Sequence, residues 1–266
     1  MGACGTVAGL ALWVTSSPEQ YSIRVSAPDL PALGKSDDVV PGLRVVPDFA
    51  DYFKEVSTAV VRPRAALQDG VQIFLLGESM GGLVAIMALL DEADLHVDGL
   101  ILCGALVRVT PELLLPAFVT PILRLVSWFS PKTSVPQEVG GDTFDGAFGD
   151  PSLGALARAD PLVCENAPVR LGTLVTFLTA MNRAKSEGHK LDVGKEHLHD
   201  PLKGDGMALY EAARALVDSL EHVKDKVIIP LEGGAHQVFQ DTPEKAKEHM
   251  EAVGHFIVER VHGTAR

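Results

Sequence analysis

The feature that most constrains the fold is a strand, a tight turn and a helix in direct succession between Val71 and Asp91. An unbroken apolar run, Ile73 to Leu76, predicts a buried strand, and an apolar pattern rich in helix-forming residues follows the turn. The turn has the sequence Gly77-Glu78-Ser79-Met80-Gly81, a G-x-S-x-G pattern. In this context the pattern is typical of a nucleophile elbow, in which a strained turn lifts the serine hydroxyl clear of the sheet edge. We therefore predict that Ser79 is a nucleophile.

The order of the predicted elements gives an α/β fold. A strand at Tyr21 to Ala27 precedes a helix that begins near Asp48 and is ended by Pro63, and another buried strand follows the elbow helix between His96 and Ala105. Such alternation is typical of a parallel sheet covered on both faces. With 266 residues, of which 47% are hydrophobic, the chain can bury one large core. We predict a single domain over residues 1–266.

Several segments resemble, in order, the monoacylglycerol lipase and plant lysophospholipase-like (caffeoylshikimate esterase-like) serine hydrolases of the α/β-hydrolase superfamily. The resemblance lies in APDLPALGKSDD, VVPDFADYFKEV, FLLGESMGGLVAIMAL, DGLILCGAL and GGAHQVFQDTPEKAKEHMEAVGHFI. It implies an α/β-hydrolase fold with a mostly parallel sheet, helices on both faces and a helical lid insertion. It is patchy at the beginning of the chain and at residues 186 to 205.

A serine hydroxyl needs a general base, and an acid that orients the base. His236 follows the last predicted strand at its carboxyl end, where open α/β sheets place their chemistry. The resemblance implies an apolar strand ahead of the acid, whereas residues 186 to 205 are polar. Asp200 is the best candidate, with Asp205 and Asp192 behind it. An exposed polar loop without a catalytic acid is the competing interpretation.

The oxyanion that forms on the substrate needs backbone N–H donors. Met80 is expected to supply one. The resemblance places the second donor in the stretch Gly2 to Gly5, at Ala3 and Cys4, and implies that the chain is shortened at its N-terminus. A competing interpretation takes Met1 to Thr6 as a myristoylation signal, with Cys4 as a neighbouring site for palmitoylation.

Residues 107 to 168 are strongly apolar but interrupted by prolines, so no single helix is expected there. Short helices with exposed Leu, Phe and Trp faces would suit a lid that covers the site, accepts an acyl chain and contacts a membrane peripherally. An ordinary helical insertion packed on the core is the alternative.

Net charge and cysteine content argue against several other classes of protein. The formal charge of −12 disfavours nucleic acid and simple electrostatic docking on anionic membranes. Three cysteines, Cys4, Cys103 and Cys164, form no paired framework, which favours a reducing, cytoplasmic location. No Cys/His cluster has metal-ligand spacing, so we expect neither metal nor cofactor. Nothing in the sequence indicates an oligomeric state.

Two functions remain open. The first is a serine esterase that hydrolyses single-acyl lipid esters, of the monoacylglycerol or lysophospholipid type, through an acyl-enzyme on Ser79; an aryl ester such as caffeoylshikimate stays open within this class. The second is a degraded homologue that keeps Ser79 and His236 but binds lipid or has no enzymatic role. A reactive serine would separate the two, because only an assembled site attacks an activated phosphonate quickly.

Overall fold

The structure is a computed structural model, and it describes most of the chain. The described residues are 23, 25–37, 48–66, 71–92, 95–109, 116, 118–135, 147–160, 162, 169–191, 196–200, 202–203, 208–221, 223, 225–229, 231–232 and 234–261.

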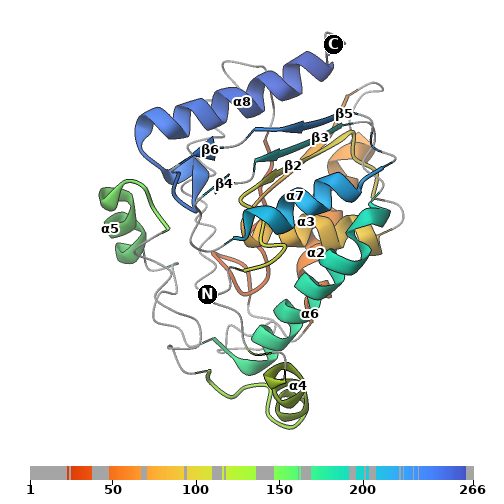
Figure 1. Cartoon of the computed structure of the whole chain (residues 1–266), viewed down its shortest axis with the longest axis vertical. Coiled ribbons are helices and arrows are strands. Elements are labelled where there is room, and N and C mark those ends of the chain that lie inside the picture. Colours follow the sequence, from red (N-terminus) through yellow and green to blue (C-terminus); the bar gives the residue numbers. More distant parts are fainter. Residues whose placement is uncertain are drawn as a thin grey trace.

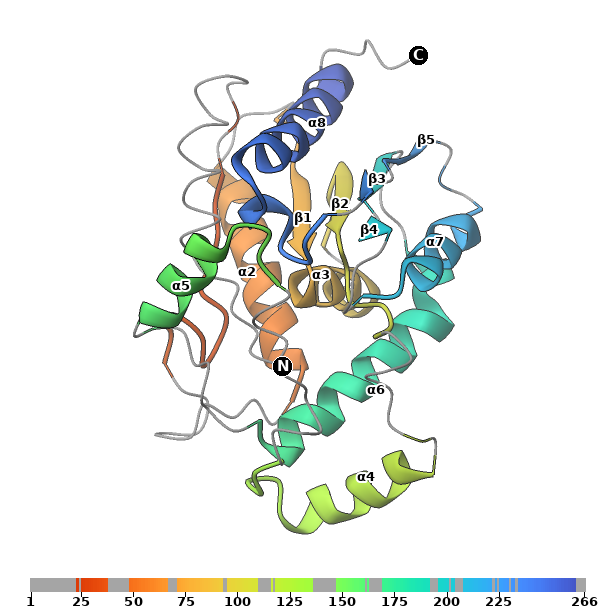
Figure 2. The same cartoon turned by 60° about the vertical axis from the view of Figure 1, so that its left-hand side comes forward.

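Among the described residues, four parallel strands form the central sheet, in the order β1-β2-β3-β5 (Figures 1 and 2). They are β1 (Phe74–Glu78), β2 (Gly99–Cys103), β3 (Glu196–Asp200) and β5 (Asp225–Ile228). A second sheet pairs β4 (Leu202–Lys203) with β6 (Leu231–Glu232), also in parallel. In the register of the main sheet, Glu78 lies opposite Cys103 and Cys103 lies opposite Asp200. The carboxyl ends of three neighbouring strands are therefore level with one another.

Strand β2 divides the interior into two hydrophobic cores. Leu100 and Leu102 face the larger core, which is built with α2 (Ala50–Ala66), α3 (Met80–Asp91) and α6 (Leu171–Glu187). Ile101 and Cys103 point to the other side, toward α8 (Pro243–Val261). Figures 1 and 2 show α8 on one face of the sheet and α2, α3 and α7 (Tyr210–Ser219) on the other. The predicted sheet with helices on both faces is confirmed.

Two short helices lie in the apolar segment between β2 and α6. They are α4 (Val119–Phe129) and α5 (Pro151–Ala159). Asp150 caps α5, because its carboxylate accepts a hydrogen bond from Ser152 N at 2.8 Å and proline takes the first turn. Helix α4 packs against α6 at the end of the molecule farthest from α8 (Figures 1 and 2). In its described part, the segment thus contains separate short helices, as its prolines predict.

Three local predictions were wrong. The sequence indicates no strand in the polar stretch, and an exposed loop was its competing interpretation, but its residues 196–200 form β3, which is hydrogen-bonded to a strand on each side. Pro63 does not end α2, which continues to Ala66. In the predicted strand at residues 21–27, the described residues Ile23 and Val25 to Ala27 are not in a strand. Backbone pairing and packing outweigh the local pattern at these places.

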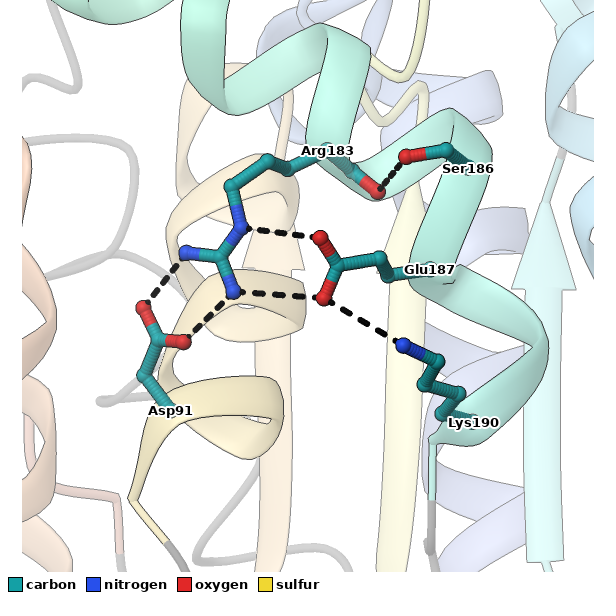
Figure 3. Close-up of polar contacts among 5 residues, drawn as sticks. All are labelled: Asp91, Arg183, Ser186, Glu187 and Lys190. Carbon is teal, nitrogen blue, oxygen red and sulfur yellow. Dashed lines mark hydrogen bonds and ion pairs between the residues drawn. The ribbon is translucent and has the colours of Figure 1, made fainter.

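A polar network ties the C-terminal end of α3 to α6 (Figure 3). Arg183 of α6 donates two hydrogen bonds to the Asp91 carboxylate, at 2.9 and 2.7 Å, and its Nε donates to Glu187 Oε1 at 3.3 Å. Lys190 Nζ, from the 3₁₀ helix η3 (Gly188–Lys190), lies 3.7 Å from Glu187 Oε2. Hydrogen bonding, first to Asp91 and then to Glu187, raises the pKa of Arg183 above its usual range. The network is partly exposed, so salt and water weaken it.

Replacement of this arginine tests the link between the two helices. We expect Arg183→Met to lower the free energy of unfolding by about 1 kcal/mol at low salt, since a bidentate pair within a network is lost. The loss should shrink at high salt, as measured by urea unfolding. Arg214→Met, which removes an exposed pair with Asp218 (3.6 Å) on α7, should have no measurable effect. A loss that is independent of salt would contradict an electrostatic link.

Candidate active site

Ser79 occupies a strained turn between β1 and α3. Its φ of 52° and ψ of −120° lie where residues other than glycine are rare. Four backbone hydrogen bonds hold the turn: Ser79 N donates to Cys103 O at 2.9 Å, and Ser79 O accepts from Leu106 N and from Gly82 N, both at 3.1 Å, and from Leu83 N at 3.4 Å. Hydrogen bonds to the end of β2 and to the residues after it therefore fix the turn. This is the geometry of the predicted nucleophile elbow.

The glycines around Ser79 differ in the space that a side chain would find there. A Cβ on Gly77 would lie 2.6 Å from Gly81 O and 2.7 Å from Gly82 Cα, and one on Gly82 would lie 2.5 Å from Ala105 Cβ. A Cβ on Gly81 would meet nothing within 4 Å. The close approach of strand and helix thus requires glycine at positions 77 and 82. At position 81 the space would accept a side chain.

The Ser79 side chain points to a histidine rather than to its own helix. Ser79 is the N-cap residue of α3, yet its hydroxyl makes no capping hydrogen bond. Its Oγ lies 2.6 Å from Nε2 of His236, which is only 2% exposed. In the tautomer that carries hydrogen on Nδ1, the hydroxyl donates to Nε2, which is the arrangement that a general base needs.

The loop that carries His236 is fixed from several directions. Asp241 accepts hydrogen bonds from Ala235 N at 2.8 Å and from Thr242 N at 2.7 Å. Gln237 N donates to Ala147 O at 2.8 Å, and His249 Nδ1 of α8 donates to Val238 O at 2.7 Å. Burial lowers the pKa of His249, so a neutral, packing role suits it. These bonds hold His236 in place without engaging its Nε2.

The residues just before α5 also contact the loop that carries His236. The Cα of Gly149 lies so close to the Asp241 carboxylate that any Cβ there would collide with Oδ1. Together with the bond from Gln237 N to Ala147 O, this contact joins the apolar segment to the histidine loop.

Glu78 brings a second acidic side chain to the site. Glu78 is partly buried. Its Oε1 accepts a hydrogen bond from Phe239 N, at 3.3 Å, in the 3₁₀ helix η4 (Val238–Gln240) that follows His236. Burial raises the pKa of Glu78 to about 7, against the opposing effects of backbone N–H groups of η4 and of His236. This carboxyl therefore changes charge near neutral pH.

The other predicted site residues have different outcomes. Met80 is the first residue of α3, so its N–H lies at the positive end of the helix, beside Ser79. Asp200 ends β3 at the same sheet edge, opposite Cys103 in register. Ala3, Cys4, Asp192 and Asp205 lie outside the described residues. Their roles, and that of Asp200, stay predictions.

Sequence reasoning missed Glu78, Asp241 and the contact through Ala147. A charged residue next to the nucleophile, after an apolar strand, was the one available signal for Glu78. The bond to Ala147 O is made by backbone atoms, which leave no trace in the sequence.

Neither a metal centre nor a membrane span is found in the described part of the chain. Within it, no three or more His, Cys, Asp or Glu residues are grouped so as to hold a metal ion. No described helix combines the length and apolarity needed to cross a bilayer.

The assembled groups can perform acyl transfer. A hydroxyl within hydrogen-bond reach of an imidazole can lose its proton as it attacks an acyl carbon. The N-terminal end of α3 lies beside that hydroxyl and favours developing negative charge. These groups suit hydrolysis of an ester or amide.

Comparisons with known proteins agree with this chemistry. The model of the family described as "Serine aminopeptidase, S33" matches residues 16–243. The monoglyceride lipase of Rattus norvegicus is 25% identical over 219 residues, which are 82% of this chain and 68% of that protein. The monoacylglycerol lipase structure from Paleococcus ferrophilus superimposes with a TM-score of 0.68 at 24% identity, covering 86% of this chain and 80% of the other. A soluble variant of Saccharomyces cerevisiae monoglyceride lipase, solved with a substrate analogue, gives a TM-score of 0.70 at 17% identity, covering 88% and 76%. The predicted α/β-hydrolase fold is confirmed.

Two glycine variants test the packing of the elbow. We expect Gly77→Ala to lower the free energy of unfolding by about 1–3 kcal/mol, because the added methyl group collides with backbone atoms. Gly81→Ala is the matched control: it meets open space inside a helix and should raise stability by about 0.5–1 kcal/mol. Chemical denaturation of both variants measures the difference, and equal stabilities would refute this packing.

Proposed function

The chain belongs to the serine aminopeptidase S33 family of hydrolases, and from that premise we propose that it is a serine esterase acting on single-acyl lipid esters, of the monoacylglycerol or lysophospholipid type. The observation that carries the proposal is the 2.6 Å contact between Ser79 Oγ and His236 Nε2 at the end of a nucleophile elbow. Ester rather than peptide hydrolysis is favoured by the relatives, which are named monoglyceride lipase, monoacylglycerol lipase and carboxyl esterase.

In the proposed mechanism, His236 takes the proton of Ser79 as Oγ attacks the ester carbonyl carbon. The tetrahedral intermediate collapses, its alcohol leaves with the proton from His236, and an acyl-enzyme remains on Ser79. Water, deprotonated by His236, then releases the fatty acid and restores the serine. No other reactant is needed.

Other residues would orient the base and stabilise the oxyanion. We assign orientation of His236 to Asp200, which ends β3 at the sheet edge where the elbow also lies. Met80 N–H would be one oxyanion donor, and the stretch with Ala3 and Cys4 would supply the other. Loss of one such donor costs about a hundred- to a thousandfold in rate.

Helix α4 supports a lipid substrate and a peripheral membrane contact. None of its residues is buried, and most of its large apolar side chains are exposed. With the preceding Phe118, the exposed set is Phe118, Ile122, Leu125, Val126, Trp128 and Phe129. Because the formal charge is −12, apolar insertion rather than charge attraction would hold this helix to a bilayer. A cytoplasmic location, peripheral to membranes, follows as a prediction.

A fluorophosphonate probe tests the nucleophile. We expect the wild-type protein to be labelled and to hydrolyse a p-nitrophenyl ester, whereas Ser79→Ala and His236→Ala should each lose labelling and at least about a thousandfold in kcat. Asp200→Asn should keep the fold and lower kcat strongly, as expected for an orienting acid. Asp98→Asn, on the loop before β2, is a control that should react normally.

The outcome also decides between the two functions. A folded wild-type protein that neither labels nor hydrolyses the ester would contradict the proposal and leave the degraded homologue. Labelling without cleavage of monoacylglycerols or lysophospholipids would point to another ester, such as an aryl ester.

Vesicle binding tests the membrane contact. Replacing Trp128 and Phe129, which are 79% and 74% exposed, by serine should weaken binding to phosphatidylcholine vesicles at least about tenfold, because two aromatic anchors are lost. Leu156→Ser on α5, at a residue 66% exposed, is the matched control and should change little. Equal effects of the two changes in a sedimentation assay would argue against docking through α4.

A further inference from the structure

Glu78 is the acidic residue that the proposed mechanism leaves without a role. It precedes the nucleophile in the chain and ends β1, while the loop it contacts belongs to His236, more than 150 positions later. A buried carboxyl is costly unless it is protonated, paired or hydrogen-bonded. We therefore expect Glu78 to have a role in the site that offsets this cost.

The contacts of Glu78 lead to the general base. Its Oε1 accepts from Phe239 N at 3.3 Å, and η4, to which Phe239 belongs, begins two residues after His236. A carboxylate there anchors the segment that follows the imidazole. His236 also acts electrostatically on Glu78 and favours its charged form. Since such coupling is reciprocal, a charged Glu78 favours the imidazolium that forms while His236 holds the serine proton.

We propose that Glu78 is a positioning residue for His236, whose carboxylate anchors η4 and supports the positive charge of the imidazolium in the transition state. This inference rests on the proposed function of Ser79 and His236, and extends it to a residue that does not touch the substrate. The support concerns the transition state, because the positive charge forms on His236 as the imidazole takes the serine proton. Loss of the carboxylate should therefore lower kcat and leave KM largely unchanged.

The surroundings of Glu78 contain few competing charges among the described residues. Asp241, on the same loop, is engaged by Ala235 N and Thr242 N. His249 of α8 donates to Val238 O, and Cys103 is the register partner of Glu78 on β2. Of these groups, His236 is the one that acts electrostatically on the Glu78 carboxyl, and it lowers the pKa of that carboxyl.

The ionisation of Glu78 gives this role a signature in pH. With a pKa of about 7, the carboxyl is neutral below that pH and charged above it. A protonated glutamic acid resembles glutamine in shape and charge, so the wild type and Glu78→Gln should differ little in acid. The advantage of the wild type should grow as the pH rises through about 7 and then level off.

The experiment compares kcat for a p-nitrophenyl ester, from acid to alkaline pH, in the wild type and Glu78→Gln. We expect the ratio of the two kcat values to rise from about one to about ten, the factor that corresponds to one pKa unit of differential interaction, with unchanged KM. Glu251→Gln removes a carboxylate elsewhere, on α8, and should keep a ratio of one at every pH. Thermal unfolding checks that each variant is folded. If Glu78→Gln does not fold, Glu78→Met replaces it as the neutral variant.

The possible results separate this inference from the proposed function. An active wild type with a ratio that does not change with pH would overturn the role of Glu78 and leave the esterase intact. A pH-dependent difference in KM, with kcat equal in the two proteins at every pH, would do the same. An inactive, unlabelled wild type would overturn the esterase and this inference together.

Discussion

The backbone hydrogen bonds around Ser79 are the constraint on which the site depends. A positive φ at a residue other than glycine costs about 1–3 kcal/mol, so the turn persists only because the surrounding fold enforces it. Cys103 O, at the end of β2, and Leu106 N, which follows this strand, hold the turn by hydrogen bonds. The close contact of Gly82 with Ala105 holds it from the helix side. Strand β2 is itself buried along its whole length between two cores. The position of one hydroxyl thus depends on the packing of the whole sheet.

The histidine is placed by a different kind of support. No regular strand or helix carries His236; its loop is instead tied by Asp241, by His249 of α8 and by Ala147. The last of these belongs to the apolar segment between β2 and α6. Because Gln237, next to His236, bonds to Ala147 O, any displacement of that segment must break or stretch a bond beside the general base. The position of this segment and the position of His236 are therefore coupled.

The sequence revealed the parts of the site that local patterns encode. The apolar run, the glycines and the helix pattern around Ser79 gave β1, the elbow and α3, and position after the last strand gave His236. Strand β3 was missed because hydrophobic periodicity is the signal for strands, and Glu-His-Leu-His-Asp lacks it. Its evidence is non-local: β2 and β5 lie on either side and satisfy its backbone groups. Pro63 misled for a related reason, since one lost hydrogen bond near the end of a packed helix need not end it.

Glu78 shows why such a prediction falls short even where the signal is visible. A glutamate that ends an apolar strand contradicts its surroundings, and contradictions of this kind gather at functional sites. The sequence displays the contradiction but not the partner, because Phe239 and His236 reach Glu78 only through the fold. A solvated carboxylate at this position would be stabilised by water and would not need hydrogen bonds from η4. A partly buried one with a pKa near 7 needs the N–H groups of η4 and a positive charge nearby to stay ionised, and the proposed reaction creates that charge on His236. The burial that makes Glu78 costly is thus also what couples it to the base.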